Sequence, residues 1–131
     1  MEENNFEYKG EKFSFHWSPE ERILYINTWG SHTEVDAKGM KEKIDEFLEK
    51  FSGLGTLNIL VDITGYNKTE FGARKVYTEI FKYPRKCFLA VCGVNMIAKL
   101  VTGFMMAAAK RGDIKFFTST KDGLKWLKGK K

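Results

Sequence analysis

The chain has 131 residues, of which 43% are hydrophobic, 15% aromatic and 30% charged, a length that fits one domain with one core. The many aromatic residues and only 2 prolines exclude a disordered, collagen-like or low-complexity chain. The formal net charge of +5 hides a division, because residues 1–65 hold 7 basic and 13 acidic side chains, whereas residues 66–131 hold 15 and 4. The basic second half therefore predicts attraction of an anionic partner. The residues expected to carry it are Lys68, Arg74, Lys75, Arg85, Lys86, Lys110 and Arg111.

The start of the sequence predicts an antiparallel hairpin. Residues 1–10 are polar and are expected to fray. Apolar and polar residues then alternate over 12–17, and a β-branched and aromatic run covers 22–29, so both segments are expected to be strands. The Ser-Pro-Glu-Glu sequence at 18–21 supplies the turn between them.

A helix is expected next, because apolar residues recur at helical spacing. They are Val35, Met40, Ile44, Phe47, Leu48 and Phe51. Two capping boxes fit its start, either Ser31 with Glu34 or Thr33 with Asp36. Gly-Leu-Gly at 53–55 is expected to end it.

The second half predicts alternating strands and helices. Residues 57–63 form an uninterrupted apolar run, as expected of a central parallel strand buried on both faces, and a polar loop follows over 64–70. Residues 71–81 carry a helical stripe that Pro84 ends. A second buried strand is predicted over 87–92.

Residues 95–110 have the most regular helical spacing in the chain. The residues of this helix expected to face the core are Ile97, Leu100, Val101 and Phe104. A strand over 114–117 and a helix capped by Ser119 or Thr120 follow, and residues 129–131 are expected to fray. The order β-β-α-β-α-β-α-β-α predicts one α/β domain over residues 1–131, with a mixed, mostly parallel sheet of about five strands and four main helices.

Cysteine use and hydropathy indicate the compartment. Cys87 and Cys92 lie five positions apart on one predicted strand, so they point to opposite faces about 16 Å apart, too far for a disulfide. The acidic start does not resemble a secretory signal, and the apolar segment 96–109 is too short to span a membrane. These features favour a cytoplasmic protein without a transmembrane segment.

The sequence lacks motifs for catalysis, metal binding or nucleotide binding. His16 and His32 are not spaced with cysteines or paired carboxylates as metal ligands are. Glycine-rich phosphate loops, a G-x-S-x-G turn and basic helices interleaved with aromatic residues do not occur either. We therefore expect a protein that is not an enzyme, has no metal or cofactor and does not bind nucleic acid. An enzyme centred on Asp62 and His32 ranks last among the hypotheses.

Asp62 is unusual because it is a carboxylate within a strand predicted to be buried, and burying it without partners costs several kcal/mol. It either accepts hydrogen bonds from backbone N–H groups or from Thr64 or Asn67, or it marks a ligand site at a topological switch point of the sheet. The first explanation is preferred. In the same segment, Thr69 is suited to cap the next helix, and Glu70 can complement the helix dipole.

Aromatic residues of the hairpin admit a second interpretation. They are Phe13, Phe15, Trp17, Tyr25 and Trp29. They are expected to be core residues, but together they could also line a cavity for a small hydrophobic or lipid-like ligand.

Four segments together resemble the STAS superfamily, and within it the SpoIIAA-like branch of anti-sigma factor antagonists. They are the strand 57–63, the segment Gly-Tyr-Asn-Lys-Thr-Glu-Phe-Gly at 65–72, the strand 88–93 with the helix after it, and the ending 114–127. The resemblance covers nearly the whole chain. It implies a noncatalytic regulatory module that binds a protein partner, or in related branches a nucleotide or small hydrophobic ligand, and a homodimer is compatible with it.

The resemblance places the binding site in the loop before the helix over 71–81. The residues expected to bind a partner or ligand are Asp62, Thr64, Tyr66, Asn67, Thr69, Glu70, Phe71 and Gly72. In the classical antagonists a kinase phosphorylates a serine in this loop, and Glu70 stands at the matching position. A carboxylate cannot be phosphorylated, so the resemblance does not extend that switch to this chain.

Overall fold

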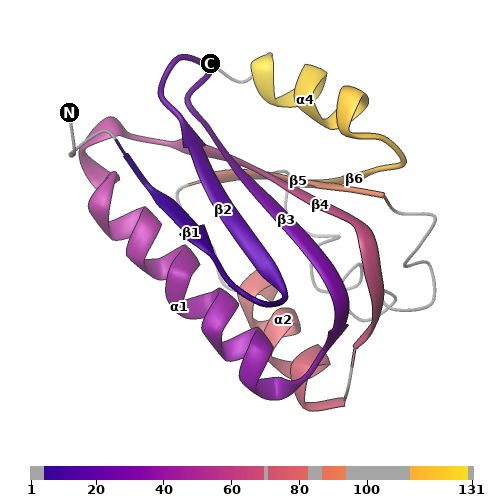
Figure 1. Cartoon of the computed structure of the whole chain (residues 1–131). Helices are drawn as coiled ribbons and strands as arrows, with labels where there is room; N and C mark the ends of the chain where they lie inside the picture. The colour runs from indigo at the N-terminus through magenta and orange to yellow at the C-terminus, as the bar shows by residue number, and fades with distance from the viewer. Residues whose placement is uncertain (1–4, 70, 83–86, 94–112, 130–131) are drawn as a thin grey trace.

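The computed structural model describes residues 5–69, 71–82, 87–93 and 113–129 (Figure 1). Its elements are β1 (Glu7–Lys9), β2 (Phe13–Ser18), β3 (Ile23–His32), α1 (Glu34–Lys50), the short 3₁₀ helix η2 (Ser52–Leu54), β4 (Leu57–Thr69), α2 (Phe71–Lys82), β5 (Cys87–Cys92), β6 (Ile114–Phe117) and α4 (Thr120–Lys128). The helix predicted over 95–110, with its core-facing residues, lies outside the described residues.

The six described strands form one mixed sheet in the order β1-β2-β3-β4-β5-β6. Strands β1, β2 and β3 pair antiparallel, whereas β3, β4, β5 and β6 pair parallel. The predicted hairpin and the central position of residues 57–63 are thus confirmed. Because the parallel strands follow one another in one direction, right-handed crossovers place α1 and α2 on the same face of the sheet.

The sheet separates two hydrophobic clusters. The larger lies under α1 and includes Phe15, Ile26, Phe47 and Ile59, and the smaller lies under α4 and includes Leu60 and Leu127 among others. Alternation along the strands produces this division, because successive side chains point to opposite faces. In the view of Figure 1, α4 accordingly lies above the sheet and α1 and α2 lie below it.

Helix α1 begins with the second of the two predicted capping boxes. The Thr33 side chain accepts from the backbone N–H of Asp36, and the Asp36 carboxylate accepts from the backbone N–H of Thr33. The buried residues of the helix are Ala37, Met40, Ile44 and Phe47. Val35, which the sequence assigned to this stripe, is 78% exposed, because it lies two positions, or about 200°, before Ala37 around the helix.

The structure corrects two predicted boundaries. Residues 7–9 do not fray but form β1, which pairs with β2 while Tyr8 packs against the larger cluster. The predicted loop 64–70 is strand as far as Thr69, because β4 continues beside the end of β3 with two register shifts. The prediction ends the strand at Ile63 because the apolar residues stop there. The backbone pairing of β4 with β3 nevertheless continues through the polar residues to Thr69.

Helix α4 closes the second face of the sheet and is capped by Ser119, whose hydroxyl accepts from the backbone N–H of Asp122. Its Gly123 rests directly on the Sγ of Cys92 in β5, where a Cβ atom would not fit. Cys87 and Cys92 are buried and lie in different clusters, which confirms that they point to opposite faces. Burial is the main reason that the pKa of Cys92 is raised to about 12.

Candidate functional site

The carboxyl ends of β3 and β4 and the first turns of α1 and α2 meet at one edge of the sheet. We call this region, residues 31–37, 64–69 and 71–75, the carboxyl edge. Parallel pairing brings the strand ends together, since Gly30 lies opposite Tyr66 and His32 opposite Thr69. Each strand end leads almost directly into a helix, at Glu34 and at Phe71, so the starts of both helices lie side by side.

The two helix starts touch through Glu34 and Gly72. A Cβ atom on Gly72 would lie 2.5 Å from the Glu34 Oε1 and 2.9 Å from its Cβ, so this close approach depends on glycine. The Glu34 carboxylate also pairs with Lys38 Nζ at 3.0 Å. An acidic side chain of α1 therefore lies against the first turn of α2, where the helix dipole favours negative charge.

A fully buried histidine lies directly behind this edge. His32, at 0% exposure, has its Nδ1 2.5 Å from the Tyr77 hydroxyl of α2 and its Nε2 3.2 Å from the backbone carbonyl of Lys12. A carbonyl only accepts hydrogen bonds, so Nε2 carries the proton and Nδ1 accepts from the tyrosine hydroxyl. Burial lowers the pKa of His32, more than the Asp36 carboxylate and neighbouring backbone carbonyls raise it.

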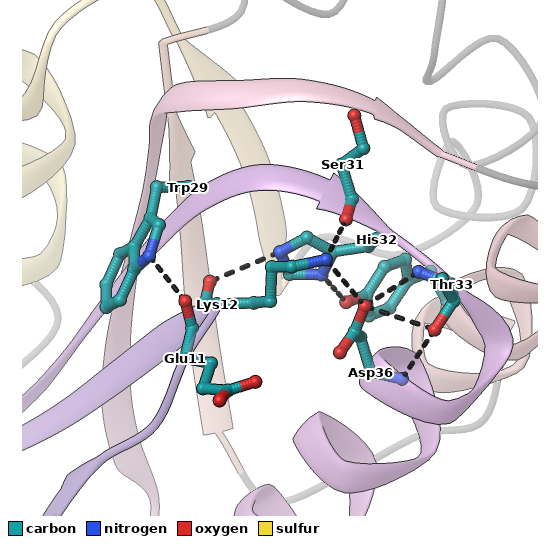
Figure 2. A network of polar contacts seen from close by, with 8 residues as sticks. Glu11, Lys12, Trp29, Ser31, His32, Thr33 and Asp36 are labelled. Carbon is teal, nitrogen blue, oxygen red and sulfur yellow. Dashed lines mark hydrogen bonds and ion pairs between the residues drawn. The ribbon is translucent and has the colours of Figure 1, made fainter.

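Charged groups surround the histidine on the side of the hairpin (Figure 2). Lys12 Nζ donates to the Ser31 carbonyl at 2.5 Å and to Asp36 Oδ2 at 3.2 Å. Burial acts to raise the pKa of the Asp36 carboxyl, but the Thr33 backbone N–H and the Lys12 ammonium outweigh it and hold the pKa below its usual value. The residue before β2, the end of β3 and the cap of α1 are thus joined by one polar network.

Asp62 is satisfied locally, as the preferred explanation predicted. Its Oδ1 accepts from the backbone N–H of Thr64 at 2.9 Å, and its backbone carbonyl accepts from the Thr28 hydroxyl at 3.1 Å. The described strands follow in chain order without a reversal, so the topological switch point that would have favoured a ligand at Asp62 is not found among them.

The predicted site residues occupy a strand and a helix start rather than a loop. Tyr66, Asn67 and Thr69 belong to β4, and Phe71 and Gly72 begin α2. Thr69 is paired with His32 at the end of the strand. Glu70 lies outside the described residues. The structure thus places the described backbone of the predicted segment, residues 64–69, 71 and 72, in the carboxyl edge.

The aromatic residues of the hairpin do not surround one cavity. Phe13 and Phe15 pack against each other, with ring centroids 5.8 Å apart, and Trp17 packs on Phe51 at 4.9 Å. Tyr25 lies with the opposite cluster and donates to Glu21 at 2.7 Å, while Trp29 donates its Nε1–H to the Glu11 carbonyl at 2.7 Å. Phe13, Phe15 and Trp17 are therefore core residues as expected, whereas Tyr25 is only partly buried beside the smaller cluster and Trp29 is half-buried outside both clusters.

Further features of the described residues concern metal binding, membrane-spanning helices and the predicted basic surface. No three His, Cys, Asp or Glu side chains among them gather closely enough to hold a metal ion. None of the described helices is both long and apolar enough to cross a membrane. Of the seven basic residues expected to attract an anionic partner, the structure describes the side chain of Lys75, which is exposed.

Sequence reasoning did not find the buried role of His32 or the exposure of Val35. The sequence predicts a strand only over residues 22–29, whereas β3 extends to His32. Val35 and Leu54 are the exposed large hydrophobic residues of the described part, at 78% and 42%. Val35 stands in the first turn of α1, within the carboxyl edge.

Comparisons with known proteins identify the fold. No family model and no curated protein matches the sequence. A crystal structure of an uncharacterized protein from the DUF3478 family, with a SpoIIAA-like fold, from Shewanella loihica PV-4 is similar to it, with a TM-score of 0.61 and 20% sequence identity over 92% of this chain and 98% of that one. The chain therefore has a SpoIIAA-like fold, as its motifs predicted.

Proposed function

We propose that this protein is a noncatalytic, STAS-like regulatory module that binds a protein partner at the carboxyl edge. The observation that carries the proposal is the exposed Val35 beside the paired helix starts at Glu34 and Gly72. An apolar side chain that is exposed in the first turn of a helix gains free energy when a partner covers it, up to about 1.5–3 kcal/mol for full burial. The SpoIIAA-like fold supports a binding role without assigning a partner.

The proposed contact residues combine this exposed surface with the segment singled out by the sequence. Glu34 and Val35 contribute from α1, and Thr64 from β4 and Gly72 from α2. Tyr66, Asn67, Thr69, Glu70 and Phe71 complete the proposed site on the basis of the sequence. Lys75, exposed on α2, adds positive charge for an anionic group on the partner.

The two exposed hydrophobic residues supply a test and its control. Val35 lies in the first turn of α1, whereas Leu54 follows the last turn, about 25 Å away for a helix of this length. Val35→Glu adds an acidic residue at a helix start, where it does not weaken the helix. Leu54→Glu makes the same kind of change away from the carboxyl edge.

Proteins that co-purify with the chain from its source cells are identified by mass spectrometry, produced separately and titrated by calorimetry. We expect Val35→Glu to weaken binding at least tenfold, or about 1.4 kcal/mol, and Leu54→Glu to leave the affinity unchanged. Both variants should keep the melting temperature of the wild type. Equal affinity for wild type and Val35→Glu would contradict the proposal. Native mass spectrometry of the same preparation tests the carrier hypothesis, which a retained apolar small molecule would favour.

A further inference from the structure

The buried histidine joins three parts of the chain that are distant in sequence. His32 ends β3, the Lys12 carbonyl lies just before β2, and Tyr77 belongs to α2. All of these contacts depend on one ring that is fully buried. One imidazole ring therefore contacts α2 through the Tyr77 hydroxyl and the start of the hairpin through the Lys12 carbonyl.

We propose that His32, as an uncharged imidazole, locks α2 to the carboxyl edge through Tyr77, and that protonation of the ring in acid releases this lock. The uncharged ring matches its surroundings, because Nε2–H faces a carbonyl and Nδ1 faces a hydroxyl donor. Protonation places a second N–H on Nδ1, so the Tyr77 hydroxyl must turn away its hydrogen. It also places a positive charge in a site without solvent.

The ionisable groups that face His32 come from each neighbouring element. Asp36 of α1 favours the charged ring, whereas the Lys12 ammonium opposes it and already pairs with Asp36 at 3.2 Å. Tyr77 of α2 contributes a neutral hydroxyl. The Asp36 carboxylate therefore already pairs with the Lys12 ammonium. Burial disfavours the charged His32 ring more than this carboxylate favours it, so the uncharged ring is preferred.

The contact with α2 is expected to open before the contact with the hairpin. The Lys12 carbonyl also accepts from the Trp29 backbone N–H at 3.0 Å, so it is held by the backbone pairing of β2 with β3. Tyr77 instead reaches His32 with its side chain. Movement of α2 can admit water to the charged ring without breaking the sheet.

The direction of the pH effect follows from linkage. The folded-state pKa of His32 is below its value of 6.5 in an unfolded chain, so the unfolded or opened state takes up the proton first as the pH falls. The contribution of the neutral ring is complete above pH 6.5 and is lost progressively below it, toward the lower folded-state pKa. Acid therefore favours the opened state.

Three variants separate the lock from general acid sensitivity. His32→Gln retains a donor and an acceptor but does not titrate, and Tyr77→Phe removes the hydroxyl while keeping the ring. His16→Gln removes the other histidine of the chain, which lies exposed beside Glu7. Hydrogen exchange is measured at pH 7.5 and pH 5.0 and corrected for intrinsic rates, with the amides of α4 as the internal reference.

In the wild type and in His16→Gln, we expect the protection of α2 amides to fall at least tenfold more than that of α4 amides between these pH values. His32→Gln should lose this difference, and Tyr77→Phe should show reduced α2 protection already at pH 7.5. An equal fall in α2 and α4 in the wild type, or an unchanged difference in His32→Gln, would overturn the proposal.

If His32→Gln does not fold, ring ¹⁵N spectra of the wild type decide. The Nε2–H tautomer at pH 7.5 supports the lock, and the Nδ1–H tautomer overturns it. These measurements need no partner, so they are independent of the proposed function. Only the further expectation that partner affinity decreases in acid rests on it.

Discussion

Replacing Gly123 with alanine is expected to destabilise the protein, although alanine is the better helix former. Gly123 lies inside α4 and faces β5, where its missing side chain lets the helix approach the sheet. A methyl group there would overlap the Cys92 Sγ, and it would lie 3.3 Å from the Ala90 Cβ and 3.4 Å from the Phe117 Cδ2. Strand β5 is held between β4 and β6, so the sheet has little freedom to yield and α4 must move.

The expected change in the free energy of unfolding of Gly123→Ala is the balance of two opposing effects. Alanine in a helix interior gains about 1 kcal/mol over glycine, and overpacking a rigid core site costs about 1–3 kcal/mol. Contact with a buried sulfur on an interior strand places the cost at the upper end, so the free energy of unfolding should fall by about 2 kcal/mol. Removing the sulfur with Cys92→Ala should cost about 1 kcal/mol, as for one buried methylene-sized group.

The double variant Gly123→Ala/Cys92→Ala distinguishes this contact from a general defect, because the new methyl group occupies the space that the sulfur leaves. Urea unfolding should show a loss below about 1 kcal/mol, where independent effects would add to about 3 kcal/mol. Gly53→Ala is the control, since a Cβ there meets nothing within 4 Å. Wild-type stability of Gly123→Ala, or additive losses in the double variant, would refute the proposed packing of α4.

Three further predictions concern the cap of α1, a buried amide and the thiols. Thr33→Ala should lower the free energy of unfolding by about 1 kcal/mol in denaturant melts, whereas Ser31→Ala should change it little; the reverse result would favour the other capping box. Asn58 is buried, and among the described residues no hydrogen bond to its side chain is found, so Asn58→Leu should raise stability by about 1–2 kcal/mol; a loss in the same melts would show that the amide is paired. Cys87 and Cys92 should resist a thiol reagent at pH 8, because both are buried and the pKa of Cys92 is about 12, and they should react in denaturant; rapid labelling of the folded protein would contradict their burial.

Hydrophobic pattern predicted most of the fold because the core elements carry it plainly. The strand at 57–63 and the hairpin were confirmed, since burial on both faces or on alternate faces leaves a direct record in the residue types. The continuation of β4 to Thr69 was not predicted. It depends on backbone pairing with β3, which residue types do not report.

The candidate site was predictable only as a segment. Residues 62–72 were chosen from a resemblance, while the neighbours that give them a surface come from elsewhere in the chain. Glu34 reaches Gly72 across two elements, and Tyr77 reaches His32 from 45 positions away. Such contacts follow from strand register and helix placement, so spacing along one sequence does not specify them.

The strand order has a consequence for protein synthesis. Each described strand pairs with the strand made immediately before it, so the sheet can grow from one side as the chain leaves the ribosome, without inserting a late strand between earlier ones. The face that carries Leu60 and Ala90 is different, because it is covered by Leu127 of α4. Among the described helices it is α4 that packs on this face, so the face stays open to chaperones or to other nascent chains until residues 120–128 have left the ribosome.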